Sequence, residues 1–267
     1  MRATTLLGLV VGLLAPVGAS AHDIWIEPST NLVRSGDWLN LSLMLGNHGN
    51  EHRDFRLASK VSAGDQHLSV MGPNGKLLDL TPSLIDNGYT PQEGFWSARF
   101  QPDTSGMYMA VSTLDKVMSY APVRDIKSAK TFFVVSGSLD KVAEKNPGFD
   151  RVLGHSLELV PVVNPVTPFG AGSVMKVRLL YKGKPLAKSK ISFIPRGGEL
   201  RGEVDPAYEK MTDAHGEAQL TLREANTYLI AAHVHDADAK GKGYESIGYS
   251  ATLCLVVPGL CPCCIGG

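Results

Sequence analysis

The sequence predicts an all-β protein with two tandem β-sandwich domains. Apolar and polar residues alternate with a period of two over most of the chain, which is typical of half-buried strands. Turn-forming residues separate these short segments, as at Pro73-Asn74-Gly75. The alternation lapses between residues 137 and 154, which divides the strands into two groups. Short strands with frequent turn signals are characteristic of β-sandwiches.

The N-terminal sandwich is expected at residues 22–136. Its clearest strand begins at Leu39, where leucines alternate with Asn40, Ser42 and Met44. The strands expected in this half are residues 39–45, 68–71, 77–80, 96–100, 107–111 and 131–135.

Residues 137–154 are expected to be a linker between the domains. Residues 138–145 are compatible with a short helix, which Asn146-Pro147-Gly148 would end. The period of two then resumes, so the C-terminal sandwich is expected at residues 155–258, followed by a Cys-rich tail at 259–267. The strands expected here are residues 157–163, 175–181, 191–193, 218–222, 227–235 and 247–257.

The first 21 residues have the features of a secretory signal peptide. Arg2 supplies a positive charge, residues 6–15 are apolar, and Ala19-Ser20-Ala21 is a small-x-small cleavage site. Cleavage after Ala21 would make His22 the first residue of an exported, periplasmic protein.

Composition and motifs exclude several classes of function. The chain has 26 Lys and Arg residues and 26 Asp and Glu residues, so it lacks the basic surplus typical of nucleic-acid-binding proteins. After the signal, no apolar run approaches the roughly 20 residues of a membrane span. The sequence has no nucleophile elbow, P-loop, dinucleotide fingerprint or HExxH motif. We therefore expect no catalytic residues and no enzymatic activity.

All four cysteines lie near the C-terminal end, as Cys254, Cys261, Cys263 and Cys264. Thiolates suit copper(I) or zinc, so a soft-metal site is one interpretation. The spacing does not match a repeated CxxC motif, and an exported tail with one or two disulfides is the other interpretation.

Four histidines are the candidate metal ligands. A terminal His22 would offer both its α-amine and its imidazole to one ion, and metal can displace the proton of an amine whose pKa is about 8. His233 and His235 share one face of an expected strand, about 6.6 Å apart. His48 lies in the loop after the strand at 39–45, where binding residues concentrate. The alternative for each residue is a solvated polar position without a ligand.

Several ordered segments resemble one known family over essentially the whole mature chain. They are Ala21-His22-Asp23-Ile24-Trp25-Ile26-Glu27-Pro28, the segment 157–165, Tyr181-Lys182-Gly183-Lys184-Pro185, Thr212-Asp213-Ala214-His215-Gly216 and the segment 249–253. The family is domain-of-unknown-function family 4198, formerly called a nickel-uptake substrate-specific region. Many members are described as periplasmic components of cobalt or nickel ABC-type transport. The second half also resembles transthyretin-like β-sandwiches, and the fold implied is a pair of immunoglobulin-like or transthyretin-like domains.

The resemblance implies a periplasmic protein that binds a divalent transition metal ion, nickel or cobalt, with copper or zinc also compatible. Its partners would be the metal ion and an inner-membrane metal transporter, and no nucleic acid. Two alternatives stay open. One is an envelope β-sandwich module with a structural or ligand-binding role and no metal. The other is a copper-dependent oxidoreductase that uses the terminal His22.

Processing after Ala21 is the first testable prediction, because the Ala19-Ser20-Ala21 site directly follows the apolar run. The intact mass of the exported protein should correspond to a chain that begins at His22. A mature chain with any other first residue would rule out a chelate formed by the amine and ring of His22.

Overall fold

The computed structural model describes residues 22–46, 63–90 and 93–260 of the chain. Within these ranges, strands dominate, and the helical elements are two short 3-10 turns, η1 (Ala63–Asp65) and η2 (Thr81–Ser83). The all-β class that the sequence predicts is therefore confirmed. No helix among the described residues is long and apolar enough to cross a membrane.

The strands form three sheets. The N-terminal sheet has the order β1 (Asp23–Pro28), β3 (Leu39–Gly46), β7 (Trp96–Phe100) and β6 (Ile85–Asp86). The C-terminal sheet contains β10 (Leu157–Pro161), β11 (Val174–Tyr181) and β12 (Lys184–Pro185), with β15 (Glu217–Thr221) also paired to β11. The nine-stranded central sheet has the order β14 (Glu209–Met211), β13 (Lys190–Pro195), β16 (Asn226–Asp236), β17 (Ser246–Val257), β9 (Val123–Ser136), β8 (Gly106–Val117), β4 (Gln66–Met71) and β5 (Leu77–Asp79), with β2 (Leu32–Arg34) paired to β9.

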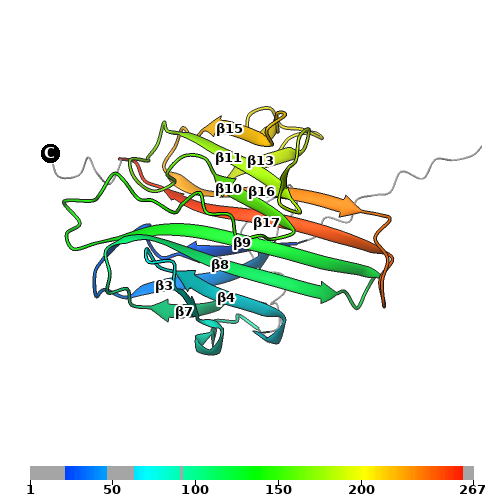
Figure 1. Cartoon of the computed structure of the whole chain (residues 1–267), viewed down its shortest axis with the longest axis horizontal. Coiled ribbons are helices and arrows are strands. Elements are labelled where there is room, and N and C mark those ends of the chain that lie inside the picture. The colour runs from blue at the N-terminus through cyan, green and yellow to red at the C-terminus, as the bar shows by residue number, and fades with distance from the viewer. Residues whose placement is uncertain (1–21, 47–62, 91–92, 261–267) are drawn as a thin grey trace, which may run out of the picture.

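The central sheet joins strands from both halves of the sequence. β9 pairs in parallel with β17, from Val123 opposite Ser246 to Thr131 opposite Cys254, and antiparallel with β8 on its other side. Figure 1 shows β17 and β9 side by side in the middle of the molecule, with β10 and β11 on one side and β3 and β7 on the other. The two sandwiches thus share this sheet, an arrangement that the sequence pattern did not predict.

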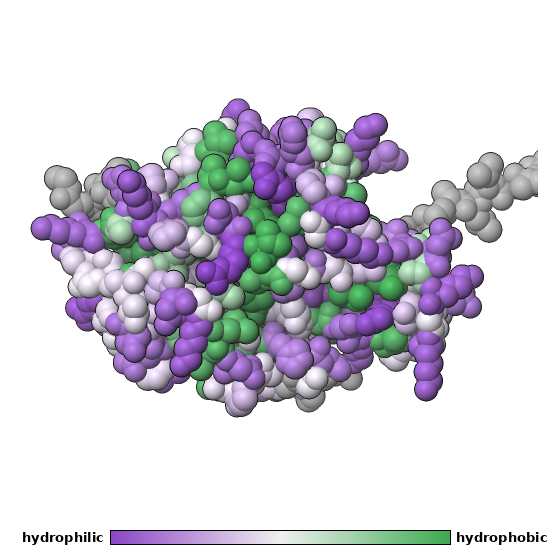
Figure 2. All heavy atoms as spheres, in the orientation of Figure 1, coloured by the Kyte–Doolittle hydropathy of each residue, from purple (hydrophilic) through white to green (hydrophobic). Residues whose placement is uncertain are grey.

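Alternate side chains of the central sheet pack into two different cores. Phe132 and Val134 of β9 contribute to the core shared with the C-terminal sheet. Phe133 and Val135 contribute to the core shared with the N-terminal sheet. Successive side chains of a strand point to opposite faces, so alternate residues of β9 pack into the two different cores. On the face drawn in Figure 2, hydrophilic residues border a narrow hydrophobic band.

The helix considered for residues 138–145 is absent, because this segment forms turns and bends. The Ser138 hydroxyl accepts a hydrogen bond from the backbone N–H of Asp140 at 3.2 Å, and the Ser136 hydroxyl donates to the carbonyl of Lys141 at 3.0 Å. Such local side-chain bonds compete with helical hydrogen bonds. Val142 is buried against the core of the C-terminal side, which further fixes the irregular path.

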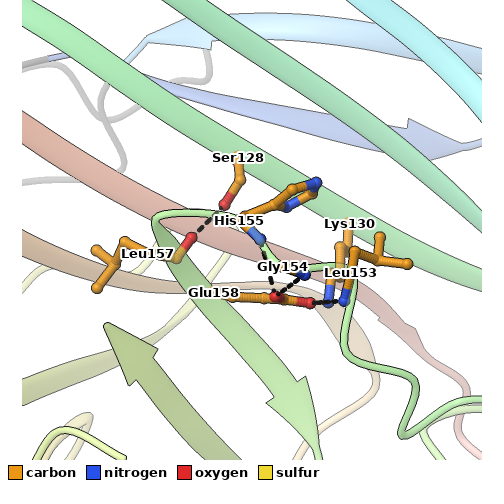
Figure 3. Close-up of polar contacts among 7 residues, drawn as sticks. All are labelled: Ser128, Lys130, Leu153, Gly154, His155, Leu157 and Glu158. Carbon is orange, nitrogen blue, oxygen red and sulfur yellow. Dashed lines mark hydrogen bonds and ion pairs between the residues drawn. The ribbon is translucent and has the colours of Figure 1, made fainter. Parts of the chain in front are cut away.

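A buried ion pair connects the central sheet to the segment before β10. Nζ of Lys130 on β9 lies 2.5 Å from Oε1 of Glu158 on β10, and the two side chains are 2% and 1% exposed. The same carboxylate accepts backbone N–H bonds from Leu153 at 2.7 Å, Gly154 at 2.9 Å and His155 at 3.1 Å. Figure 3 shows this chain segment folded around the Glu158 carboxylate. Four donors on one carboxyl group require its ionised form.

The environment sets the charge of this pair. Burial alone would raise the pKa of Glu158, but Lys130 and the N–H of Leu153 outweigh it, and the pKa lies below its usual value of 4.5. Burial also lowers the pKa of Lys130, although Glu158 opposes this change. The lowered pKa of Glu158 favours the ion pair, whereas the lowered pKa of Lys130 opposes it. The four hydrogen-bond donors on the Glu158 carboxylate keep that carboxylate ionised.

Removal of the Glu158 charge should destabilise the fold strongly, because Lys130 would then be a buried cation without its counter-ion. We expect Glu158→Gln to lower the free energy of unfolding at neutral pH by about 3–5 kcal/mol in urea denaturation. Asp37→Asn is the matched control, since it breaks an Arg34–Asp37 pair whose side chains are 60% and 46% exposed, and it should cost below about 1 kcal/mol.

The same variant should have a defined pH dependence. A lowered carboxyl pKa contributes stability above the unfolded-state value of 4.5, and this stability is lost as pH falls through the folded-state pKa. The stability difference between the parent and Glu158→Gln should therefore shrink as pH falls below 4.5. A difference that stays constant down to low pH would contradict the assigned charge state.

Candidate functional site

The start of β1 is fixed on the central sheet. The Trp25 side chain is fully buried and packs against Leu229 of β16 and Cys254 of β17. The hydroxyl of Thr252 donates to the carbonyl of Ile24 at 2.7 Å. Because Trp25 is the largest fully buried side chain, its burial sets the position of the residues just before it.

A buried lysine holds the backbone of His22. Nζ of Lys127 on β9 donates to the His22 carbonyl at 2.9 Å and lies 3.2 Å from Oδ2 of Asp125. The side chains of Lys127 and Asp125 are 6% and 7% exposed, so the ion pair is largely shielded from solvent. The first described residue, His22, is therefore fixed through its backbone carbonyl.

Asp23 brings β1 to the histidine strand. Its Oδ1 lies 2.8 Å from Nε2 of His233 on β16. In the register of the central sheet, His233 is opposite Ser250 of β17, and Ser250 is opposite Lys127 of β9. These three side chains therefore form one row beneath the start of β1. The Ser250 hydroxyl is buried and has no hydrogen-bond partner among the described residues, so a polar ligand or water would satisfy it.

The carboxylate alters the acid–base behaviour of His233. Asp23 raises the pKa of His233 above its usual value of 6.5, although burial and the nearby Lys127 and Lys190 oppose this shift. The His233 side chain is still 53% exposed, so it is accessible to a solute. Contact of Nε2 with a carboxylate orients the ring and leaves Nδ1 for a ligand, which is a common second-sphere arrangement at metal sites.

His235 continues the same face of β16, two residues after His233. It is exposed and pairs in register with Gly248 of β17, which in turn pairs with Asp125 of β9. A side chain at Gly248 would place a Cβ 2.8 Å from Oδ1 of Asp125. Glycine at this position therefore leaves space for the buried Asp125–Lys127 pair next to His235.

The structure brings three of the four candidate histidines to one region. His22 is adjacent to Asp23, which contacts His233, and His235 lies on the same face of β16. His48 falls outside the described residues. Among the described residues, no group of three or more His, Cys, Asp and Glu side chains is arranged to hold a metal ion.

Sequence reasoning missed the groups that position the histidines. Asp125 and Lys127 lie in the first part of β9, residues 123–131, where charged and hydroxyl residues are mixed with apolar ones and no alternation marks a buried face. The two faces of β16 were assigned correctly from the sequence. Tyr228, Ile230 and Ala232 lie in the core, while His233 faces the other way.

Cys254 is separate from the Cys-rich tail expected at 259–267. Cys254 lies on β17 in the core with Trp25 and Leu229, and burial raises the pKa of its thiol well above the usual value. A buried neutral thiol is a poor metal ligand. Cys261, Cys263 and Cys264 lie outside the described residues.

A separate cavity lies between the edges of the central and C-terminal sheets. It has a volume of about 490 Å³ and its lining includes Tyr208, Lys210, Leu220, Arg223 and Tyr228. This volume is within the usual range for small-molecule sites, about 300–1,000 Å³. Glu224 also lines the cavity, so its wall combines apolar and aromatic residues with charged side chains of both signs.

Comparison with known proteins assigns the family. A family model described as a domain of unknown function, DUF4198, matches residues 19–236. The chain belongs to this family. The matched region includes β1 and the part of β16 that carries His233 and His235, and it ends before β17. No curated protein matches this DUF4198 chain.

Solved structures show only distant similarity. The D0-D1 domain of intimin is 10% identical, with 88% of this chain and 98% of that chain covered and a TM-score of 0.23. A DUF4785 family protein from Legionella pneumophila is 14% identical, with 78% of this chain and 51% of that chain covered and a TM-score of 0.30. Escherichia coli alpha-2-macroglobulin activated by porcine elastase is 14% identical, with 89% and 20% covered and a TM-score of 0.28. The chain thus spans about half of the Legionella protein and a fifth of the macroglobulin. With TM-scores below 0.5, these likenesses carry no argument about function.

The contact between Asp23 and His233 should be detectable by titration. Asp23→Asn removes the charge that raises the pKa of His233, so that pKa should fall in an NMR titration of the imidazole C–H signals. Asp37→Asn removes an exposed carboxylate from an unrelated ion pair and is expected to leave the His233 titration unchanged. If Asp23→Asn leaves it unchanged as well, β1 does not lie against β16 in solution.

Proposed function

We propose that the protein is an exported, non-enzymatic metal-binding protein that captures a divalent transition ion, nickel or cobalt, for metal uptake or handling. The proposal rests on one observation: Oδ1 of Asp23 lies 2.8 Å from Nε2 of His233. Asp23 follows His22, the expected first residue after processing, so this contact brings the start of β1 to the face of β16 that carries the histidines. Asp23 and His233 are 210 positions apart in the sequence, so chance proximity along the chain does not explain the contact.

The proposed ligands differ in how they are held. After cleavage behind Ala21, His22 would supply its α-amine and imidazole, while Lys127 keeps its carbonyl in place. His233 would bind through Nδ1 because Asp23 occupies Nε2. His235 and His48 are the further candidates. Imidazole and amine nitrogens suit nickel, copper and zinc. Which of these ions is bound would therefore depend on the coordination geometry and on which metal is available.

The proposed setting is the periplasm, reached through the cleaved signal peptide, with an inner-membrane metal transporter as partner. DUF4198 is described only as a domain of unknown function, so the support for this setting is the resemblance of the sequence to family members linked to cobalt and nickel uptake. A site with a partly exposed His233 suits a carrier, since a bound ion must be transferred to a partner.

The cavity of about 490 Å³ favours a second candidate function, a ligand-binding envelope module that needs no metal. The half-buried Tyr208 offers its ring to an apolar or sugar-like ligand, and Lys210, Arg223 and Glu224 offer charges of both signs. This candidate and the metal site involve different residues, so one protein can be tested for both.

Metal binding should depend on the free amine of His22. Calorimetric titration with nickel and cobalt should show binding at least ten times weaker when one extra residue precedes His22, a loss of about 1.4 kcal/mol. The extension keeps the imidazole but converts the basic amine into an amide. His233→Ala should also weaken binding, whereas His215→Ala, in an exposed turn, should not. Equal affinity of the extended and processed forms would exclude the amine as a ligand, and absence of binding to both would favour the metal-free module.

The affinity for metal should also decrease as the pH is lowered. Protons compete with metal for imidazole nitrogens, and the usual pKa is about 6.5. Because Asp23 raises the pKa of His233, competition at this residue should begin at a higher pH than for an unperturbed imidazole. Titrations at two pH values, repeated with Asp23→Asn, measure this effect.

A further inference from the structure

Three methionines line a small cavity at one end of the central sheet. Met71 comes from β4, and Met107 and Met109 come from β8. The cavity has a volume of about 20 Å³, and Pro147, Gly148 and Arg151 of the interdomain segment complete its wall. A space of this size accommodates about one water molecule or one ion.

The register of the sheet directs the three thioethers to the same place. Met71 is directly opposite Met109 in the antiparallel pair of β4 and β8. Opposed residues have Cβ atoms about 5 Å apart. Met107 is two residues from Met109 on the same face, about 6.6 Å along the strand. Methionine has three rotatable side-chain bonds, so sulfurs at these spacings can converge on one point.

The surroundings of the cavity suit a soft, singly charged metal ion. Met107 and Met109 are 5% and 3% exposed and belong to the core on the C-terminal side, while Met71 packs against that core. Thioethers are neutral, soft ligands that select copper(I) over harder ions. A methionine cluster that served only as packing would be expected to fill its own gap, because flexible methionine side chains adapt to irregular spaces.

Arg151 contributes to the wall of this cavity and is exposed on its other side. Its Nη1 lies 3.2 Å from Sδ of Met71. A guanidinium at this position repels a cation and occupies a lone pair of the Met71 sulfur. A cation bound by the methionines would therefore have to displace Arg151 from Met71.

We propose that Met71, Met107 and Met109 form a second metal site, which binds one copper(I) ion through three thioether sulfurs. The site is separate from the terminal histidines and does not depend on the proposed nickel or cobalt function. Binding involves no electron transfer, because copper enters and leaves in the same oxidation state.

Competition with a chromophoric copper(I) chelator tests the proposal. The experiment uses the processed chain carrying His233→Ala together with Cys261→Ser, Cys263→Ser and Cys264→Ser, under anaerobic conditions, so that copper(I) at the terminal histidines and at the tail thiols contributes little. We expect this protein to withdraw one equivalent of copper(I) from the chelator. Met109→Leu, which nearly conserves side-chain volume, should weaken binding at least tenfold. Met211→Leu, at an exposed position of β14, is the matched control and should change nothing. Arg151→Gln removes the cation and should tighten binding.

A second measurement does not depend on any variant. Limited peroxide oxidation, followed by peptide mass spectrometry, reports whether a bound ion protects each methionine sulfur. Silver(I), a redox-stable soft ion, should protect Met71 and leave Met211 as reactive as before. The proposal is overturned if the parent does not compete for copper(I), if Met109→Leu binds as well as the parent, or if silver(I) fails to protect Met71. Failure here would leave the nickel and cobalt titration of the terminal site unaffected.

Discussion

Burial of β9 on both of its faces is the constraint that organises the rest of the molecule. One face of β9 packs on the C-terminal sheet and the other on the N-terminal sheet. Any polar side chain on this strand must therefore find a partner inside the protein. Lys130 pairs with Glu158, Lys127 with Asp125, and the Thr131 hydroxyl donates to the carbonyl of Cys254. The Lys130 and Thr131 contacts connect β9 to β10 and β17, and Lys127, whose partner Asp125 is on β9 itself, also donates to the His22 carbonyl. The hydrogen bonds that satisfy these buried polar groups therefore also hold the strands together.

The same constraint explains how the first residues of the described chain reach a histidine strand over 200 positions away. Lys127 needs an acceptor on the face covered by β1, and the His22 carbonyl supplies it. The fully buried Trp25 fixes the strand that follows. The cross-strand row from Lys127 through Ser250 to His233 then places Asp23 next to the imidazole. The candidate site is thus a consequence of how β9 is covered: His233 and His235 lie on β16, and His22 directly precedes β1.

Local patterns predicted the strands well and their long-range partners poorly. The alternation of apolar and polar residues located β3, β7 and β16, and it assigned the two faces of β16 correctly. The parallel pairing of β9 with β17 leaves no such trace, because the partners are more than 100 residues apart and each strand looks the same whatever its neighbour. For the same reason, Lys130 and Glu158 could not be paired from sequence. His22 and His233 were named as candidates from chemistry alone, and the contact of the neighbouring Asp23 with His233 required the fold.

The most direct measurement is anomalous X-ray diffraction at the nickel absorption edge from crystals of the processed protein grown with nickel. The proposed site predicts one strong peak within bonding distance of the His22 amine, the His22 ring and Nδ1 of His233, with Nε2 of His233 still facing Asp23. A peak bound by other residues, or a processed N terminus located away from β16, would contradict the proposed site.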